Sequence, residues 1–133
     1  MSEKNKNCIL IVEKDLKNIV SLSQKCIEAG VDENCIFATI STSDISRFLN
    51  TKNISTVIID SELYNLKSAS VIKNFALNEN LETILVKSEF TKKTIRMMMD
   101  KNLKYISLNM KSNDLSRVLA SDDKIVEKKV VHL

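Results

Sequence analysis

Short apolar runs alternate with segments of helical periodicity along almost the whole chain. The runs cover residues 8–12, 35–40, 56–59, 82–86 and 103–107 or 103–108. Each run is brief and gives way to polar or charged residues, which is typical of strands buried on both faces of a parallel sheet. Helical spacing follows each run, around residues 16–27, 45–49, 69–76, 95–99 and 115–119. This order predicts an α/β protein with a parallel sheet and right-handed crossovers.

The helix after the first run has clear signals at both ends. Asp15 is placed to cap its N-terminus, and Gly30 is placed to end it in the left-handed conformation. Apolar or small residues recur between them at helical spacing, and we expect them to form the inner face. These residues are Leu16, Ile19, Val20, Ser23, Cys26 and Ile27.

Composition narrows the function classes. The chain has 133 residues, which predicts one domain, and it contains one glycine and no proline. Gly-rich phosphate loops, dinucleotide fingerprints and nucleophile elbows all need several glycines, so the sequence argues against them. His132 is the single histidine, which argues against a His-based metal site or catalytic triad. We therefore expect a protein that is not an enzyme and that carries no flavin or nucleotide.

Charge and cysteine usage point to a soluble protein of the cytoplasm. The net charge is +3, and the basic residues are scattered among acidic ones, which argues against nucleic-acid binding. The three cysteines lie in apolar stretches and form no C-x-x-C pair, which indicates reduced, buried thiols. No apolar run is long enough for a signal peptide or a membrane span.

Three short motifs resemble the receiver domain of two-component response regulators, the CheY-like superfamily. They are residues 9–15 (Ile-Leu-Ile-Val-Glu-Lys-Asp), 57–60 (Val-Ile-Ile-Asp) and 105–107 (Tyr-Ile-Ser), at the separations usual in that family. The resemblance covers about residues 7–120. It implies a flavodoxin-like (βα)5 three-layer sandwich with a parallel sheet of order 2-1-3-4-5. It also implies a site beyond the carboxyl ends of strands 1 and 3.

The resemblance assigns the acidic pocket to residues that match the family only in part. Asp60 stands at the position that accepts a phosphoryl group from a histidine kinase. Two acidic residues after strand 1 normally hold Mg²⁺; here Glu13 fills the first position and Lys14 the second, with Asp15 next. If a metal site is retained, Glu13 and Asp60 are its expected ligands.

At two further positions this sequence departs from the family pattern, and at a third it matches the pattern. Lys87 stands where a small hydroxyl residue normally ends strand 4, with Ser88 one place later. Leu108 replaces the usual lysine after strand 5, whereas Tyr105 keeps the aromatic switch position.

These departures predict a degenerate receiver, or pseudo-receiver, that needs no cofactor. An ammonium at position 14 stands where Mg²⁺ would sit, and an ion pair between Lys14 or Lys87 and Asp60 would fill the pocket. Two alternatives stay open. The first is a phosphorylatable single-domain response regulator that uses Mg²⁺ and Asp60. The second is a small-molecule-binding protein with the flavodoxin-like fold.

Protein partners are the expected ligands of such a chain. The resemblance implies that recognition, and possible homodimer formation, uses the face of helix 4, strand 5 and helix 5, including Tyr105. We expect a receiver-like domain over residues 1–120 and a C-terminal tail over residues 121–133. The tail pattern allows an extension of the last helix, a disordered end or an added strand over residues 125–131.

Overall fold

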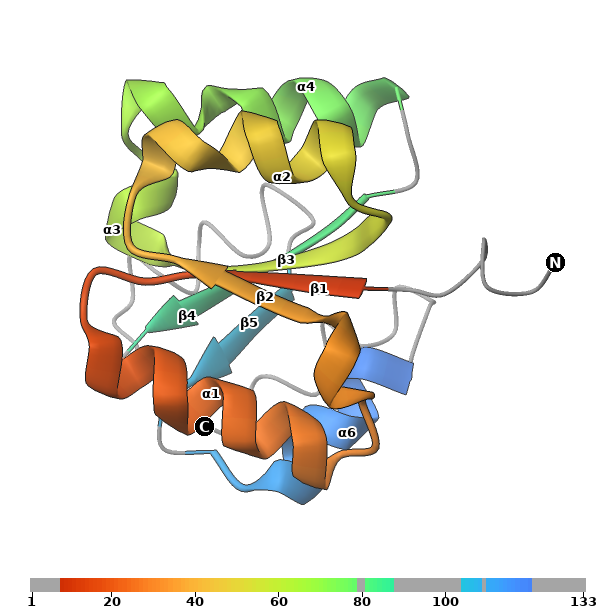
Figure 1. Ribbon diagram of the computed structural model, residues 1–133. Helices are drawn as coiled ribbons and strands as arrows, with labels where there is room; N and C mark the ends of the chain where they lie inside the picture. Colours follow the sequence, from red (N-terminus) through yellow and green to blue (C-terminus); the bar gives the residue numbers. More distant parts are fainter. Residues whose placement is uncertain (1–7, 79–80, 88–103, 109, 121–133) are drawn as a thin grey trace, which may run out of the picture.

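A five-stranded parallel sheet forms the centre of the computed structural model (Figure 1), which describes residues 8–78, 81–87, 104–108 and 110–120. Its strand order, β2-β1-β3-β4-β5, confirms the predicted order 2-1-3-4-5 and the flavodoxin-like fold class. All four pairings between neighbouring strands are parallel. The strands are β1 (Cys8–Val12), β2 (Ile36–Thr39), β3 (Ile54–Asp60), β4 (Glu82–Lys87) and β5 (Lys104–Ser107).

Helices cover both faces of the sheet and produce two separate cores. Helices α1 (Leu16–Glu28) and α6 (Ser112–Ala120) lie side by side on one face, whereas α2 (Ile45–Thr51) and α4 (Ser70–Asn78) cover the other (Figure 1). Alternate residues of each strand enter opposite cores, so that Leu10 packs towards α2 and α4 while Ile11 packs towards α1 and α6. This two-sided burial explains why the strands are continuous apolar runs.

The predicted ends of α1 are confirmed, but its predicted inner face is partly wrong. The Asp15 carboxylate accepts a hydrogen bond from the Lys17 backbone N–H at 3.0 Å, and Gly30 has φ +104°. Leu22, which was left out of the predicted face, is 0% exposed, whereas Leu16 and Val20 are 65% and 68% exposed. The helix carries two adjacent apolar stripes, and packing against the sheet buries the one that contains Leu22.

Other predicted boundaries need smaller corrections. Strand β2 begins at Ile36 because Cys35 belongs to a preceding 3₁₀ turn, Glu33–Cys35. A short helix that the pattern did not predict, α3 (Ser61–Tyr64), follows β3 directly. The helix expected around residues 95–99 and the tail at 121–133 lie outside the described residues. Within the described part, α6 ends at Ala120.

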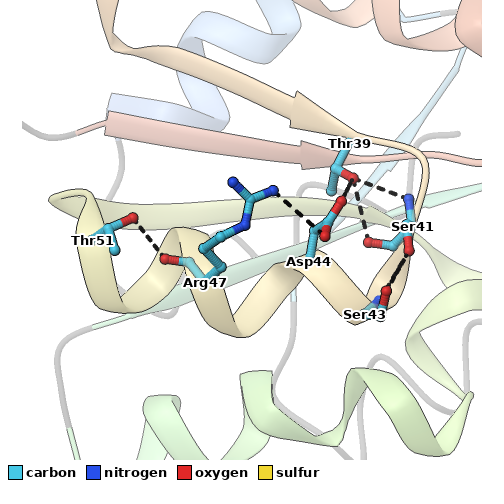
Figure 2. Close-up of polar contacts among 6 residues, drawn as sticks. All are labelled: Thr39, Ser41, Ser43, Asp44, Arg47 and Thr51. Carbon is cyan, nitrogen blue, oxygen red and sulfur yellow. Dashed lines mark hydrogen bonds and ion pairs between the residues drawn. The ribbon is translucent and has the colours of Figure 1, made fainter.

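A network of side-chain hydrogen bonds fixes the loop between β2 and α2 (Figure 2). The Thr39 hydroxyl donates to an Asp44 carboxylate oxygen at 3.2 Å and accepts from the Ser41 backbone N–H at 3.0 Å. Asp44 also forms an ion pair with Arg47, at 3.5 Å. The Thr39 carbonyl accepts from the Glu13 backbone N–H at 3.2 Å, so this network holds the loop against the end of β1.

Replacing Thr39 with valine should destabilise the protein by about 1–2 kcal/mol. The substitution removes the buried hydroxyl, so that the Asp44 carboxylate and the Ser41 backbone N–H each lose a hydrogen bond. Valine keeps the shape of the side chain, so the loss reports the hydrogen bonds. The matched control is Thr51→Val, which removes an exposed hydroxyl bonded to the Arg47 carbonyl at 2.7 Å and should cost less than about 0.5 kcal/mol. Urea unfolding of both variants checks this, and equal stability of Thr39→Val and the unmodified chain would contradict it.

Candidate functional site

The sheet register brings the predicted pocket residues together at the carboxyl ends of β1 and β3. Val12, the last residue of β1, pairs with Ile59, and Asp60 is the last residue of β3. Glu13, which follows Val12, therefore lies next to Asp60 along the same edge of the sheet. Asp15 stands apart from this pair: its side chain caps α1 and is exposed to solvent.

The Glu13 side chain is completely buried and only partly satisfied. It is 0% exposed, and its Oε1 accepts a hydrogen bond from Asn18 Nδ2 at 3.2 Å. Its Oε2 has no hydrogen-bond partner within the part of the chain that the structure describes. Burial raises the pKa of this carboxyl above 4.5, the bond from Asn18 opposes the rise, and the nearby charge of Asp60 adds to it.

Asp60 is held by the helix that it starts. Its Oδ1 accepts hydrogen bonds from the backbone N–H groups of Glu62 at 2.8 Å and Leu63 at 3.3 Å, so Asp60 is the N-cap of α3. An aspartate is well suited to this role because its oxygen satisfies the free N–H groups of the first turn. One carboxylate oxygen of Asp60 is thereby committed to the protein backbone.

Lys14 forms an ion pair with Glu62, a residue that sequence reasoning did not single out. The expected pair between Lys14 or Lys87 and Asp60 is not formed among the residues that the structure describes. The Lys14 and Glu62 side chains are 52% and 66% exposed, so the pair bridges the β1 and β3 loops at the surface. The bond to Glu62 and the charge of Asp60 both raise the pKa of Lys14. The signal for Glu62 was its position in the first turn of α3, a helix that the periodicity did not predict.

The two remaining substituted positions lie next to each other at the ends of β4 and β5. Lys87 is the last residue of β4, and its carbonyl accepts from the Leu108 backbone N–H at 3.1 Å. The Leu108 side chain packs against the α1–α6 core, and its carbonyl accepts from Lys25 Nζ at 2.7 Å. Leu108 therefore presents an apolar side chain to the core where the family pattern has a cation. Ser88 lies outside the described residues.

Tyr105 faces the core. It is 3% exposed and packs in the cluster that includes Tyr64 and Leu85. Burial, with a smaller contribution from Tyr64, raises the pKa of Tyr105 to about 12. The sequence prediction counts this ring as part of a recognition surface, and in the structure the ring is buried.

The carboxylates of the pocket are partly engaged within the protein, and an ammonium lies beside them. Two carboxyl groups, Glu13 and Asp60, lie together, and Asp60 gives one oxygen to the α3 N-terminus. Glu62, the next acid, is paired with the Lys14 ammonium. Within residues 8–78, 81–87, 104–108 and 110–120 there is no group of three histidine, cysteine, aspartate or glutamate residues that could hold a metal ion. Mg²⁺ requires oxygen ligands in near-octahedral geometry, and an adjacent ammonium opposes a cation.

Solved structures with the same arrangement include receiver domains as well as two proteins from Burkholderia described as pilus assembly proteins. A signal receiver domain from Vibrio parahaemolyticus superposes with a TM-score of 0.68 and 15% identity, over 93% of this chain and 92% of that one. A CheY-like response regulator receiver domain protein from Methanospirillum hungatei superposes with a TM-score of 0.65 and 14% identity, over 96% of this chain and 98% of that one. A third receiver domain is that of the response regulator Ssk1 from Saccharomyces cerevisiae, crystallised with the histidine phosphotransfer protein Ypd1. Its TM-score is 0.65 and its sequence identity is 13%, over 85% of this chain and 86% of that one.

These likenesses show the fold of this chain. No family model matches the sequence, and no curated protein matches it. The described part of the chain thus has the fold of CheY-like receiver domains, with sequence identity too low to carry a function across. Among the helices that the structure describes, none is both long and apolar enough to cross a membrane.

Proposed function

We propose that this chain is a receiver-like signalling protein of the cytoplasm that acts by binding another protein and is not switched by Mg²⁺-dependent phosphorylation. The observation that carries this proposal is the Lys14–Glu62 ion pair beside Asp60. It places an ammonium at the position where the family has its second metal-binding acid.

The chemistry of phosphoryl transfer supports this interpretation. Transfer to a carboxylate depends on positioning and on neutralising the charge of the phosphoryl oxygens, which a metal ion and nearby cations normally provide. Here Lys14 occupies the position of the second acid, and the residue after β5 is Leu108, whose partly buried side chain packs against the core. Asp60 Oδ1 is engaged as the cap of α3, so the backbone already holds one of the two oxygens of this carboxylate.

Protein binding is the function that remains for such a scaffold. One of the similar structures is a receiver domain in complex with a phosphotransfer protein, which supports a protein partner for this chain as well. We place the recognition surface on the face of β5 and α6, together with the helix expected around residues 95–99 and the tail at 121–133. Because Tyr105 is buried, exposed residues of α6 such as Asn113 and Arg117 would make the contacts.

The test is phosphorylation itself. The purified chain is incubated with acetyl phosphate and Mg²⁺, and separately with beryllofluoride and Mg²⁺, and is followed by intact-mass spectrometry and NMR. We expect no phosphoryl adduct and no shift of the resonances around Asp60. The matched variant is Lys14→Asp, which supplies the missing acid and should increase Mn²⁺ binding, measured by electron paramagnetic resonance. Stoichiometric modification of Asp60 in the unmodified chain would contradict the proposal.

One observation favours the second candidate, a phosphorylatable single-domain response regulator. Glu13 Oε2 is a buried oxygen that has no partner among the described residues, as a metal ligand would be before its ion binds. In that case Glu13 and Asp60 would hold Mg²⁺, and Asp60 would accept the phosphoryl group. The same experiment distinguishes the two candidates, because beryllofluoride would then bind in the presence of Mg²⁺.

A further inference from the structure

Exposed apolar side chains gather on one side of the molecule, along α1 and the end of β2. Five large hydrophobic residues of the described chain are exposed, and four of them belong to this side. On α1 these are Leu16, Val20 and Ile27, with 65%, 68% and 37% of their surfaces exposed. At 100° per residue they fall within about 40° of one another, so they form one stripe along the helix. The fourth, Ile40, follows β2 and is 55% exposed.

The stripe lies on the flank of α1 that faces away from α6 and towards β2. Lys25 marks the opposite flank, because its ammonium reaches the Leu108 carbonyl beyond β5. It is about 160° around the helix from the centre of the stripe. On β2, Ile36 and Ala38 pack against the α1 core and are only half-buried. Side-chain alternation along the strand places Ile40 in line with them.

Strand β2 is also an open edge, and its four residues, Ile-Phe-Ala-Thr, include no charged or proline residue that would discourage pairing. It is the outermost strand of the described sheet and bonds to β1 on one side only (Figure 1). Natural edge strands normally carry lysine, proline or a bulge because an open edge recruits other strands. The other outer strand of the described sheet, β5, carries Lys104.

We propose that this face, made of Leu16, Val20, Ile27, Ile36, Ala38 and Ile40, is the interface with a second copy of this chain. The arrangement is self-complementary under a two-fold axis, as an interface between identical copies must be. Antiparallel β2 strands centred on Ala38 place Ile36 opposite Ile40 of the second copy. The two α1 helices then run antiparallel on the same face of a continuous sheet, with Leu16 opposite Ile27 of the second copy.

The charges beside the stripe fit the same pairing. Lys17 and Glu28 are both exposed, and they lie on the outer flank of the stripe at opposite ends of α1. The antiparallel arrangement brings Lys17 of each copy towards Glu28 of the other, whereas a parallel one would set like charges together. This dimer leaves the β5–α6 face open for a different partner, and it does not depend on whether Asp60 is phosphorylated.

Sedimentation velocity of the full chain over a range of concentrations tests the proposal. We expect a species of twice 15.1 kDa. Val20→Glu should raise its dissociation constant by roughly a hundredfold, because the substitution buries an unpaired charge at the interface. Since Val20 is largely exposed, this variant should fold normally. The matched control is Leu66→Glu, which changes an exposed apolar residue outside this face and should leave the dimer intact.

Charge reversal gives a second readout. Lys17→Glu and Glu28→Lys should each raise the dissociation constant by roughly fivefold, and the double variant should restore it. Hydrogen exchange of the unmodified chain should show β2 amides becoming protected as the concentration rises. A chain that stays monomeric at its highest accessible concentration would overturn the proposal. So would a dimer that survives Val20→Glu, or one that Leu66→Glu disrupts equally.

Discussion

Replacing Leu22 with alanine is expected to lower the free energy of unfolding by about 2–5 kcal/mol, which is a large share of the stability of a domain this size. Leu22 is 0% exposed and packs against Ile11 and Ile58 in the core beneath α1. Truncation removes buried methyl groups and leaves a cavity that the close-packed surroundings fill only in part. Urea denaturation followed by circular dichroism measures the loss.

Val20→Ala is the matched control for this prediction, because Val20 lies two residues away in the same helix. Its side chain is 68% exposed, so truncation should change the free energy of unfolding by less than about 0.5 kcal/mol. The measurement is made at protein concentrations at which the chain is monomeric. Equal losses in the two variants would mean that α1 does not pack with Leu22 inward.

Replacing Glu13 with glutamine is expected to stabilise the protein by about 1 kcal/mol or more at neutral pH. The Glu13 carboxyl is fully buried, and its Oε2 has no partner within the described part of the chain. At neutral pH the charged form bears the cost of desolvation close to the charge of Asp60. Glutamine keeps the size of the side chain and an oxygen for Asn18 while removing that charge.

The same prediction has a definite pH dependence. Burial raises the pKa of Glu13 in the folded protein above the ordinary glutamate value that it has in the unfolded chain. Between these two values the folded state binds the proton more tightly, so the unmodified protein loses stability as the pH rises through this window. At a pH well below both values the carboxyl is protonated in both states, and the penalty of burying its charge disappears. The free energy of unfolding of Glu13→Gln should therefore increase relative to that of the unmodified chain as the pH rises from acidic to neutral.

Urea midpoints of both proteins at several pH values measure this difference. Comparing the two proteins at each pH removes the contribution of other groups, such as Glu62, whose pKa is lowered by the bond from Lys14. A constant difference between the two proteins from pH 4 to 8 would contradict the prediction. Loss of stability in Glu13→Gln at neutral pH would do so as well, because the carboxylate would then be favourable in its site.

The sequence by itself determined the order of elements and the main assignment of the pocket. Continuous apolar runs identified the five strands because residues buried on both faces of a sheet must be apolar throughout. Asp15 and Gly30 located both ends of α1, since capping and left-handed turns depend on local chemistry. The resemblance to receiver domains placed Glu13 and Asp60 together, at the carboxyl ends of the first and third strands.

The tertiary structure alone decided which apolar stripe of α1 is buried and which partners the pocket residues choose. Leu16 and Val20 match the helical period as well as Leu22 does, and only the position of the helix on the sheet distinguishes them. Likewise, Lys14 pairs with Glu62, 48 positions later in the chain. That pairing depends on α3 starting directly after Asp60, which places Glu62 within reach of Lys14. The periodicity of a sequence shows which residues can share a face of a helix or strand, but it carries no information about contacts between distant segments.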